Sequence, residues 1–225
     1  MKKFKLEKKQ IPNILTIFRI LLVPVIIVLM LVQFGPTIYT FDISHDHNSL
    51  FAPHVTINLN ILLSAIFFII ASLTDAVDGY VARKMHWVSD FGKFWDPLAD
   101  KILTNSVLFC LASPQLNIVP IWIPIILLIR DIIVDGTRMM SAKQNLVVPA
   151  NWWGKVKTIN IMVAIIVAFF IGNNYGNVTT AYYWAAQNIL MYTSAALSVI
   201  SGIIYYTKFI KIYNKSKQQL QEANK

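Results

Sequence analysis

Charged side chains are scarce in this sequence. Of its 225 residues, 14% are charged and 56% are hydrophobic, whereas a soluble domain carries roughly 25% charged residues. A water-exposed surface needs more charge than this, so the composition excludes an ordinary soluble domain and favours an integral membrane protein. The single cysteine, Cys110, excludes an internal disulfide, and we expect it to be a small buried hydrophobic residue.

Six apolar stretches are long enough to cross a bilayer, whose core of about 30 Å needs roughly 20 residues per helix. We therefore predict an all-α integral membrane protein with six transmembrane helices in one membrane domain, residues 12–210. A basic N-terminal segment (1–11) and a C-terminal tail (211–225) flank this domain, both on the cytoplasmic side. The predicted spans are residues 12–33, 56–82, 91–112, 117–139, 153–173 and 182–210.

Basic residues are absent from one set of predicted loops. Residues 33–54, 113–118 and 172–181 contain no Lys or Arg, and most of the basic residues lie before the first span, after the last span and in the alternate loops. The positive-inside rule then predicts a multi-pass protein of the cell membrane with both termini in the cytoplasm. The net charge of +9 reflects this orientation and attraction to anionic lipids, so we expect no nucleic-acid partner.

Four aspartates gather on two neighbouring predicted helices. Asp75 and Asp78 end the second span, and Asp96 and Asp100 begin the third. Residues three and four apart share a helix face, so each pair forms a stripe, and the short connection lets the stripes face each other. A carboxylate at the centre of a membrane helix costs about 2.5–3.5 kcal/mol, and four of them repel one another. Two divalent cations, Mg²⁺ or Mn²⁺, would offset this charge because they prefer oxygen ligands.

Small residues accompany the aspartates. Gly79, Ala82 and Gly92 leave the stripes without bulk, so a phosphorylated ligand can approach the backbone closely. Helix packing in the membrane is the alternative role for such residues. Their occurrence together with four carboxylates favours the ligand-binding role.

The pattern D-x2-D-G-x2-A-R-x8-G-x3-D-x3-D, between residues 75 and 100, resembles the signature of the CDP-alcohol phosphotransferase family. This resemblance implies a six-helix membrane fold, usually homodimeric, with a cytoplasm-facing polar active-site cavity and two divalent metals. It implies that Asp100 is also the general base that removes the proton from the acceptor hydroxyl. The implied metal ligands are Asp75, Asp78, Asp96 and Asp100, and the implied CDP-binding residues are Asp78, Gly79, Ala82, Arg83 and Gly92.

The resemblance narrows to the branch of the family that makes phosphatidylglycerophosphate in phospholipid biosynthesis. The first predicted span opens with a segment similar to that branch, in which Asn13, Thr16 and Arg19 roughly share a helix face. We expect these residues to contact the nucleotide or the cavity. The alternatives are an N-cap, a hydroxyl bonded back to its own helix and an arginine that reaches the membrane surface.

A basic cluster in the fourth and fifth predicted spans bears on the acceptor. Arg130 lies within an apolar span; we expect its neighbour Asp131 to point elsewhere, so that another aspartate or a ligand phosphate pairs with Arg130. Glycerol 3-phosphate carries such a phosphate, whereas inositol, serine and choline do not. The predicted acceptor-phosphate residues are Arg130, Arg138, Lys155 and Lys157. For Arg138 and Lys155 the alternative is a positive-inside role at a helix end.

These features predict an enzyme that transfers the phosphatidyl group of CDP-diacylglycerol to sn-glycerol 3-phosphate, giving phosphatidylglycerophosphate and CMP. Sibling reactions with phosphatidylglycerol (cardiolipin synthase), inositol or serine are alternatives. A cation transporter is disfavoured because the third span is apolar at Val107–Leu111, and a non-catalytic scaffold would not need four intact acids. The outer segment 33–54 is long and contains His45, His47 and His54, which we expect to be solvated rather than bound to metal.

Overall fold

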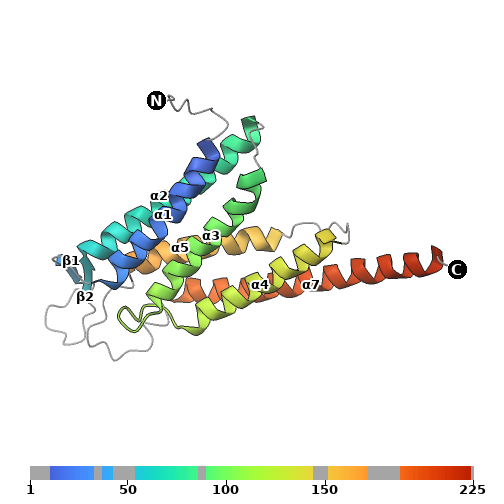
Figure 1. Ribbon diagram of the computed structural model, residues 1–225. Helices are drawn as coiled ribbons and strands as arrows, with labels where there is room; N and C mark the ends of the chain where they lie inside the picture. Colours follow the sequence, from blue (N-terminus) through green and yellow to red (C-terminus); the bar gives the residue numbers. More distant parts are fainter. Residues whose placement is uncertain are drawn as a thin grey trace, which may run out of the picture. The chain divides into compact units, whose positions relative to one another are not determined.

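The computed structural model describes residues 11–32, 37–42, 54–85, 90–143, 152–171 and 188–223 (Figure 1). Within these ranges, some side chains lie outside the description, among them those of residues 75–85, 90, 91 and 93 and of most strand residues. The described residues form six helices and two strands. In chain order these are α1 (Ile11–Leu31), β1 (Thr37–Asp42), β2 (His54–Asn58), α2 (Leu59–Met85), α3 (Asp90–Leu111), α4 (Trp122–Lys143), α5 (Trp152–Ile171) and α7 (Ile189–Ala223).

The chain divides into two compact units. The first comprises residues 1–119 and 165–187, and the second comprises residues 120–164 and 188–225. Helix α5 therefore contributes its first part to the second unit and its last part to the first unit.

In the first unit, α1 packs against α2 and α3. The side chains of Val23, Ile26 and Met30 form the buried face of α1, at the three- and four-residue spacing of a helix that contacts its neighbours along one stripe. The ring of Phe68 on α2 lies 5.9 Å from the ring of Phe169 on α5, and both side chains are buried. This apolar packing holds the helices that carry the predicted metal ligands.

In the second unit, α4 packs against α7, and a polar side chain ties α5 to α7. The Asn160 amide of α5 donates to the Leu190 carbonyl at 3.2 Å and to the Ser194 hydroxyl at 2.8 Å. The rings of Trp122 and Tyr192 stack with their centroids 5.7 Å apart. Because buried polar groups need partners in an apolar environment, these bonds fix how the helices of this unit pair.

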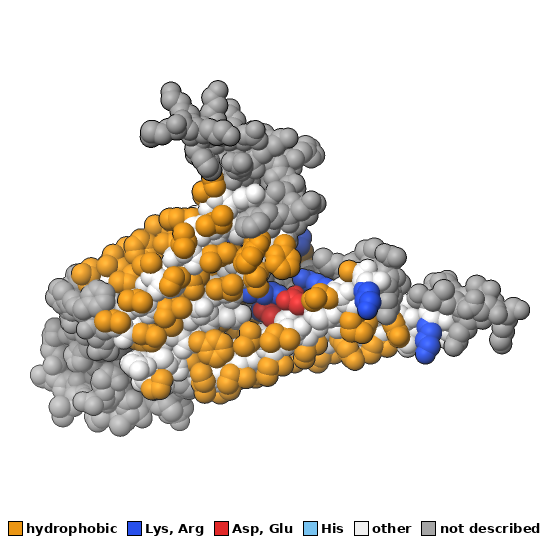
Figure 2. Space-filling model, viewed as in Figure 1, with side chains coloured by type: hydrophobic (Ala, Val, Ile, Leu, Met, Phe, Trp, Pro, Cys, Tyr) orange, Lys and Arg blue, Asp and Glu red, His pale blue; other side chains and the backbone are white. Residues whose placement is uncertain are grey.

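The surface of the described helices is apolar, as expected for a membrane protein. Each of the six helices exposes large hydrophobic side chains, and Figure 2 shows such side chains along much of the visible face. Three segments are long and apolar enough to cross a membrane: 13–31 in α1, 152–170 in α5 and 189–214 in α7. Helix α2 has a shorter apolar stretch at residues 59–74.

One element departs from the all-helical prediction. Strands β1 and β2 pair antiparallel, with Tyr39 opposite Ile57 and Phe41 opposite Val55. Residues 54–58 were predicted partly as loop and partly as the start of the second span, which was wrong. Alternating β-branched and aromatic residues favour strands, and this short run precedes the helical periodicity that begins at Leu59.

The last helix is longer than its predicted span. Residues 182–210 were predicted to cross the membrane, and residues 211–225 were predicted to form a tail. Helix α7 continues through Lys211 to Ala223 without interruption, so most of the predicted tail is helical.

Candidate active site

Two of the four predicted metal ligands have described side chains. Asp96 and Asp100 lie one turn apart on α3, and both are half-buried. Gly92 lies one turn before Asp96 and is buried. Residues four apart share a helix face, so the predicted stripe on α3 is confirmed as a feature of the helix. Carboxylates accessible at one face supply the hard oxygen donors that suit Mg²⁺ or Mn²⁺, so the donor chemistry of this stripe fits the predicted metals.

The other half of the predicted site is on α2. Asp75, Asp78, Gly79, Ala82 and Arg83 all fall within this helix, which contacts α3. Their side chains lie outside the described residues. Among the side chains that the structure describes, no group of three or more possible metal ligands occurs. The complete four-aspartate set therefore stays a prediction.

Helix α1 supports the aspartate stripe. The Thr16 hydroxyl donates to Asp96 Oδ1 at 2.5 Å, and the Thr16 side chain is fully buried. This hydrogen bond joins α1 to α3 and therefore differs from the alternative expectation, a Thr16 hydroxyl bonded back to its own helix. A hydrogen bond to a carboxylate is directional and charge-assisted, so Thr16 orients Asp96.

Arg19 is also directed inward. Its side chain is 1% exposed, and its Nε donates to the Ala71 carbonyl of α2 at 3.3 Å. An arginine that reaches the membrane surface would be exposed, so that alternative is wrong. Asn13, at the start of the same face, is half-buried. The face predicted to contact the nucleotide or the cavity thus points into the first unit at Thr16 and Arg19.

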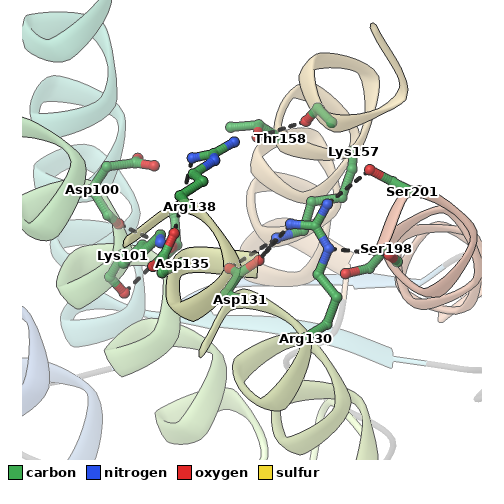
Figure 3. A network of polar contacts seen from close by, with 12 residues as sticks. Asp100, Lys101, Arg130, Asp131, Asp135, Arg138, Lys157, Thr158, Ser198 and Ser201 are labelled. Carbon is green, nitrogen blue, oxygen red and sulfur yellow. Dashed lines mark hydrogen bonds and ion pairs between the residues drawn. The ribbon is translucent and has the colours of Figure 1, made fainter. Parts of the chain in front are cut away.

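Arg130 in the second unit has three hydrogen bonds (Figure 3). Its Nε donates to the Ser198 carbonyl at 3.1 Å, one terminal nitrogen donates to Asp131 Oδ1 at 2.8 Å, and the other donates to the Ser201 hydroxyl at 2.7 Å. The expectation that Asp131 points elsewhere is therefore wrong. Adjacent residues on a helix project about 100° apart, but the long arginine side chain bends back far enough to reach the carboxylate.

Lys157 of α5 shares the same carboxylate. Its Nζ donates to both oxygens of Asp131 at 3.0 Å. The side chains of Arg130, Asp131 and Lys157 are 16%, 12% and 10% exposed. Two cations therefore meet one anion in a nearly buried triad that joins α4 to α5 (Figure 3).

The other two predicted acceptor-phosphate residues are exposed. The guanidinium of Arg138 lies 5.5 Å from the centre of the Tyr205 ring and 3.9 Å from Asp135, and its side chain is 58% exposed. The Lys155 ammonium lies 6.0 Å from the centre of the Trp152 ring. The structure thus brings Arg130 and Lys157 together on Asp131, and it does not bring Lys155 to that carboxylate.

The sequence reading missed one face of α7. Ser198, Ser201 and Gly202 surround Arg130, and Tyr205 lies beneath Arg138. An added Cβ at Gly202 would lie 3.1 Å from Cγ of Arg130, so any larger residue would require the arginine side chain to shift. The three-, four- and seven-residue spacing of these positions was the available signal, because it places all four on one side of a helix.

Known proteins similar to this chain point to one family. The sequence pattern of the family described as CDP-alcohol phosphatidyltransferase matches residues 9–200. A CDP-diacylglycerol–glycerol-3-phosphate 3-phosphatidyltransferase of Mycoplasma pneumoniae is 37% identical over 216 residues, which cover 92% of this chain and 90% of the relative. A protein of the same name from Bacillus subtilis is 35% identical over 198 residues, with 88% and 94% covered. A third, from Mycoplasma genitalium, is 33% identical, with 96% and 89% covered.

Proposed function

Because the chain belongs to the CDP-alcohol phosphatidyltransferase family, we propose that it transfers the phosphatidyl group of CDP-diacylglycerol to sn-glycerol 3-phosphate. The products are phosphatidylglycerophosphate and CMP. The observation that carries the proposal is the intact set of signature residues on two contacting helices, α2 and α3. Relatives that carry the name of this reaction, each aligned over most of both chains, support it.

The choice of acceptor is supported by the second unit. Arg130 and Lys157 lie within hydrogen-bonding distance of one carboxylate. Two cations fixed near each other are a suitable receptor for a phosphate monoester. Glycerol 3-phosphate carries this group, whereas serine and inositol lack it. Phosphatidylglycerol carries a phosphodiester, which makes cardiolipin synthesis the second candidate.

Within the proposed reaction, Asp100 removes the proton from the acceptor hydroxyl. The hydroxyl oxygen attacks the phosphorus of the phosphatidyl group, and the bond between this phosphorus and the CMP oxygen breaks. Asp75, Asp78, Asp96 and Asp100 would hold two divalent ions, Mg²⁺ or Mn²⁺, which would supply positive charge to balance the pyrophosphate and the leaving CMP. Thr16 keeps the Asp96 carboxylate oriented. The CDP group is bound by Asp78, Gly79, Ala82, Arg83 and Gly92, with Asn13 and Arg19 on the neighbouring face of α1.

We further propose six membrane spans with both termini in the cytoplasm, a cytoplasm-facing cavity and a homodimeric assembly. The apolar stretches of α1, α5 and α7 support the membrane location. The absence of Lys and Arg from alternate loops of the sequence supports the orientation. In this arrangement Arg138 and Lys155 lie near the cytoplasmic surface, where they would guide an anionic acceptor toward Arg130 and Lys157.

An acceptor panel tests the function. Purified protein in detergent–lipid micelles is given CDP-diacylglycerol and Mg²⁺ or Mn²⁺ with glycerol 3-phosphate, phosphatidylglycerol, serine or inositol, and CMP release is measured. We expect release with glycerol 3-phosphate, and its loss after chelation with EDTA. Release with serine or inositol instead would overturn the acceptor assignment, and release with phosphatidylglycerol alone would identify a cardiolipin synthase.

A further inference from the structure

The proposed acceptor-phosphate site already contains an anion. Both oxygens of Asp131 accept from Lys157, and Oδ1 also accepts from Arg130. The three charges sum to one positive charge. Asp131 is 12% exposed, so its bonds to these cations are only weakly screened by water. A carboxylate in this position could either compete with a phosphate or hold the two cations ready for one.

We propose that Asp131 is a positioning residue for the acceptor phosphate, a role that rests on the proposed function. Without a shared anion, the charges of Arg130 and Lys157 repel each other, and both long side chains lose their fixed geometry. With Asp131 present, the two cations stay within 3.0 Å of one carboxylate. Fixing a side chain before the ligand arrives lowers the entropy lost on binding.

The hydrogen-bond inventory of Arg130 favours positioning over competition. A guanidinium has five N–H donors. The contacts to Asp131, Ser201 and the Ser198 carbonyl use one donor on each of the three nitrogens. The second donor on each terminal nitrogen has no partner among the described residues. A phosphate can therefore bind Arg130 while the contact with Asp131 is kept.

Helix α7 provides the backing for this arrangement. Ser201 and the Ser198 carbonyl hold the guanidinium from one side, and Gly202 lets its stem pass close to the helix. Asp131 then fixes the other side and joins it to Lys157 (Figure 3). Arg130 is thus oriented by three groups from two helices, and Asp131 connects it to the second cation, Lys157.

The experiment is a steady-state comparison of Asp131→Asn with wild type, in which the concentration of each substrate is varied in turn. Asparagine keeps the size of the side chain and one oxygen acceptor but loses the charge. We expect the KM for glycerol 3-phosphate to rise about tenfold, while kcat and the KM for CDP-diacylglycerol change less than about twofold. Lys211→Gln is the control, because Lys211 is an exposed charged residue of α7 outside the proposed site; it should leave all three constants unchanged.

Several outcomes would overturn the proposal. An unchanged KM for glycerol 3-phosphate in Asp131→Asn would remove the positioning role. A lower KM would mean that the carboxylate competes with the phosphate. An equal rise in both KM values would mean a general structural role. Failure of the wild type to release CMP with glycerol 3-phosphate would instead remove the proposed function, so the two failures are distinguishable.

A second pair of variants covers the case in which Asp131→Asn fails to fold. Asp131→Asn/Lys157→Gln removes one charge of each sign and leaves no unpaired lysine. If Asp131 acts by holding the cations, the double variant should have a KM for glycerol 3-phosphate about two- to threefold above that of Lys157→Gln alone, because only Arg130 is left to be positioned and Ser201 and the Ser198 carbonyl still hold it. A further tenfold rise in the double variant would mean that Asp131 acts by another route and would contradict the proposal.

Discussion

Two carboxylates, one in each unit, show how differently the two halves of the chain treat an acid. Asp96 in the first unit accepts a hydrogen bond from a neutral hydroxyl, that of Thr16. Asp131 in the second unit accepts from two cations, Arg130 and Lys157. Asp96 is half-buried and Asp131 is 12% exposed, and of the two only Asp131 has its charge balanced by side chains of the described residues.

The difference suggests which acid is prepared for a metal. A carboxylate that is oriented by a hydroxyl keeps its negative charge available, and oxygen ligands of this kind suit hard divalent ions. A carboxylate already paired with two cations has no such capacity. We therefore expect changes in the first unit to affect the chemical step and changes in the second unit to affect acceptor binding.

The largest effect is expected from Asp100→Asn. The amide is close in size to the carboxylate but cannot accept the hydroxyl proton or balance a metal charge. We expect kcat to fall by about 10³-fold or more, since general base catalysis alone contributes about 10²–10⁴-fold. The measurement is the initial rate of CMP release at saturating substrates.

Lys211→Gln serves as the control for this loss, because Lys211 lies outside the signature and is exposed. Thermal unfolding in detergent reports whether each variant is folded. A folded Asp100→Asn protein that releases CMP at the wild-type rate would refute the assignment of the base.

The next largest effect is expected from Lys157→Gln. Removing one partner of a buried, hydrogen-bonded charge pair costs about 2 kcal/mol or more, which corresponds to roughly a 30-fold loss in kcat/KM for glycerol 3-phosphate. We expect this loss to lie in KM, with little change in kcat. Lys211→Gln, which removes an exposed lysine of α7, should have no such effect. A loss confined to kcat would contradict the expectation that residues of the second unit affect acceptor binding and not the chemical step.

Gly202→Ala should produce an intermediate effect. Its new Cβ would lie 3.1 Å from Cγ of Arg130, so the arginine must shift away from α7. Overpacking of this kind costs about 1 kcal/mol, and we expect a roughly fivefold rise in the KM for glycerol 3-phosphate. Gly136→Ala is the matched control, because no atom lies within 4 Å of a Cβ added there. Equal KM values in the two variants would show that the contact with Arg130 is unimportant for acceptor binding.

Thr16→Val should produce the smallest effect. Valine keeps the shape of threonine but removes the hydrogen bond to Asp96, worth about 0.5–1.5 kcal/mol. We expect the Mg²⁺ concentration for half-maximal activity to rise about threefold, with the KM for glycerol 3-phosphate unchanged. Thr207→Val, at an exposed position of α7, provides the comparison. A change in the KM for glycerol 3-phosphate, with no change in the Mg²⁺ requirement, would contradict this role, because it would mean that Thr16 affects acceptor binding rather than the metal site.

The sequence was sufficient for features that depend on local spacing. The helices that carry the predicted spans begin and end within a few residues of the expected positions for α1, α3 and α5. The stripe of Gly92, Asp96 and Asp100 follows from the four-residue helical period alone. The burial of Cys110 was confirmed for the same reason, since it lies in an apolar run that packs against neighbouring helices.

Features that depend on three-dimensional contacts were not predictable. The pairing of Arg130 with its neighbour depends on how a flexible side chain bends, which helix periodicity does not describe. The role of Gly202 depends on the approach of α4, a helix that begins 80 residues earlier in the chain. The two strands were missed because they are 6 and 5 residues long and β2 joins directly onto α2.

Identification of the lipid product tests the central claim most directly. Purified protein is incubated with CDP-diacylglycerol, Mg²⁺ and isotopically labelled glycerol 3-phosphate, and both CMP and the lipid products are quantified by mass spectrometry. We expect one labelled phosphatidylglycerophosphate for each CMP released. CMP accompanied by phosphatidic acid, or by a lipid without the label, would contradict the proposed transfer.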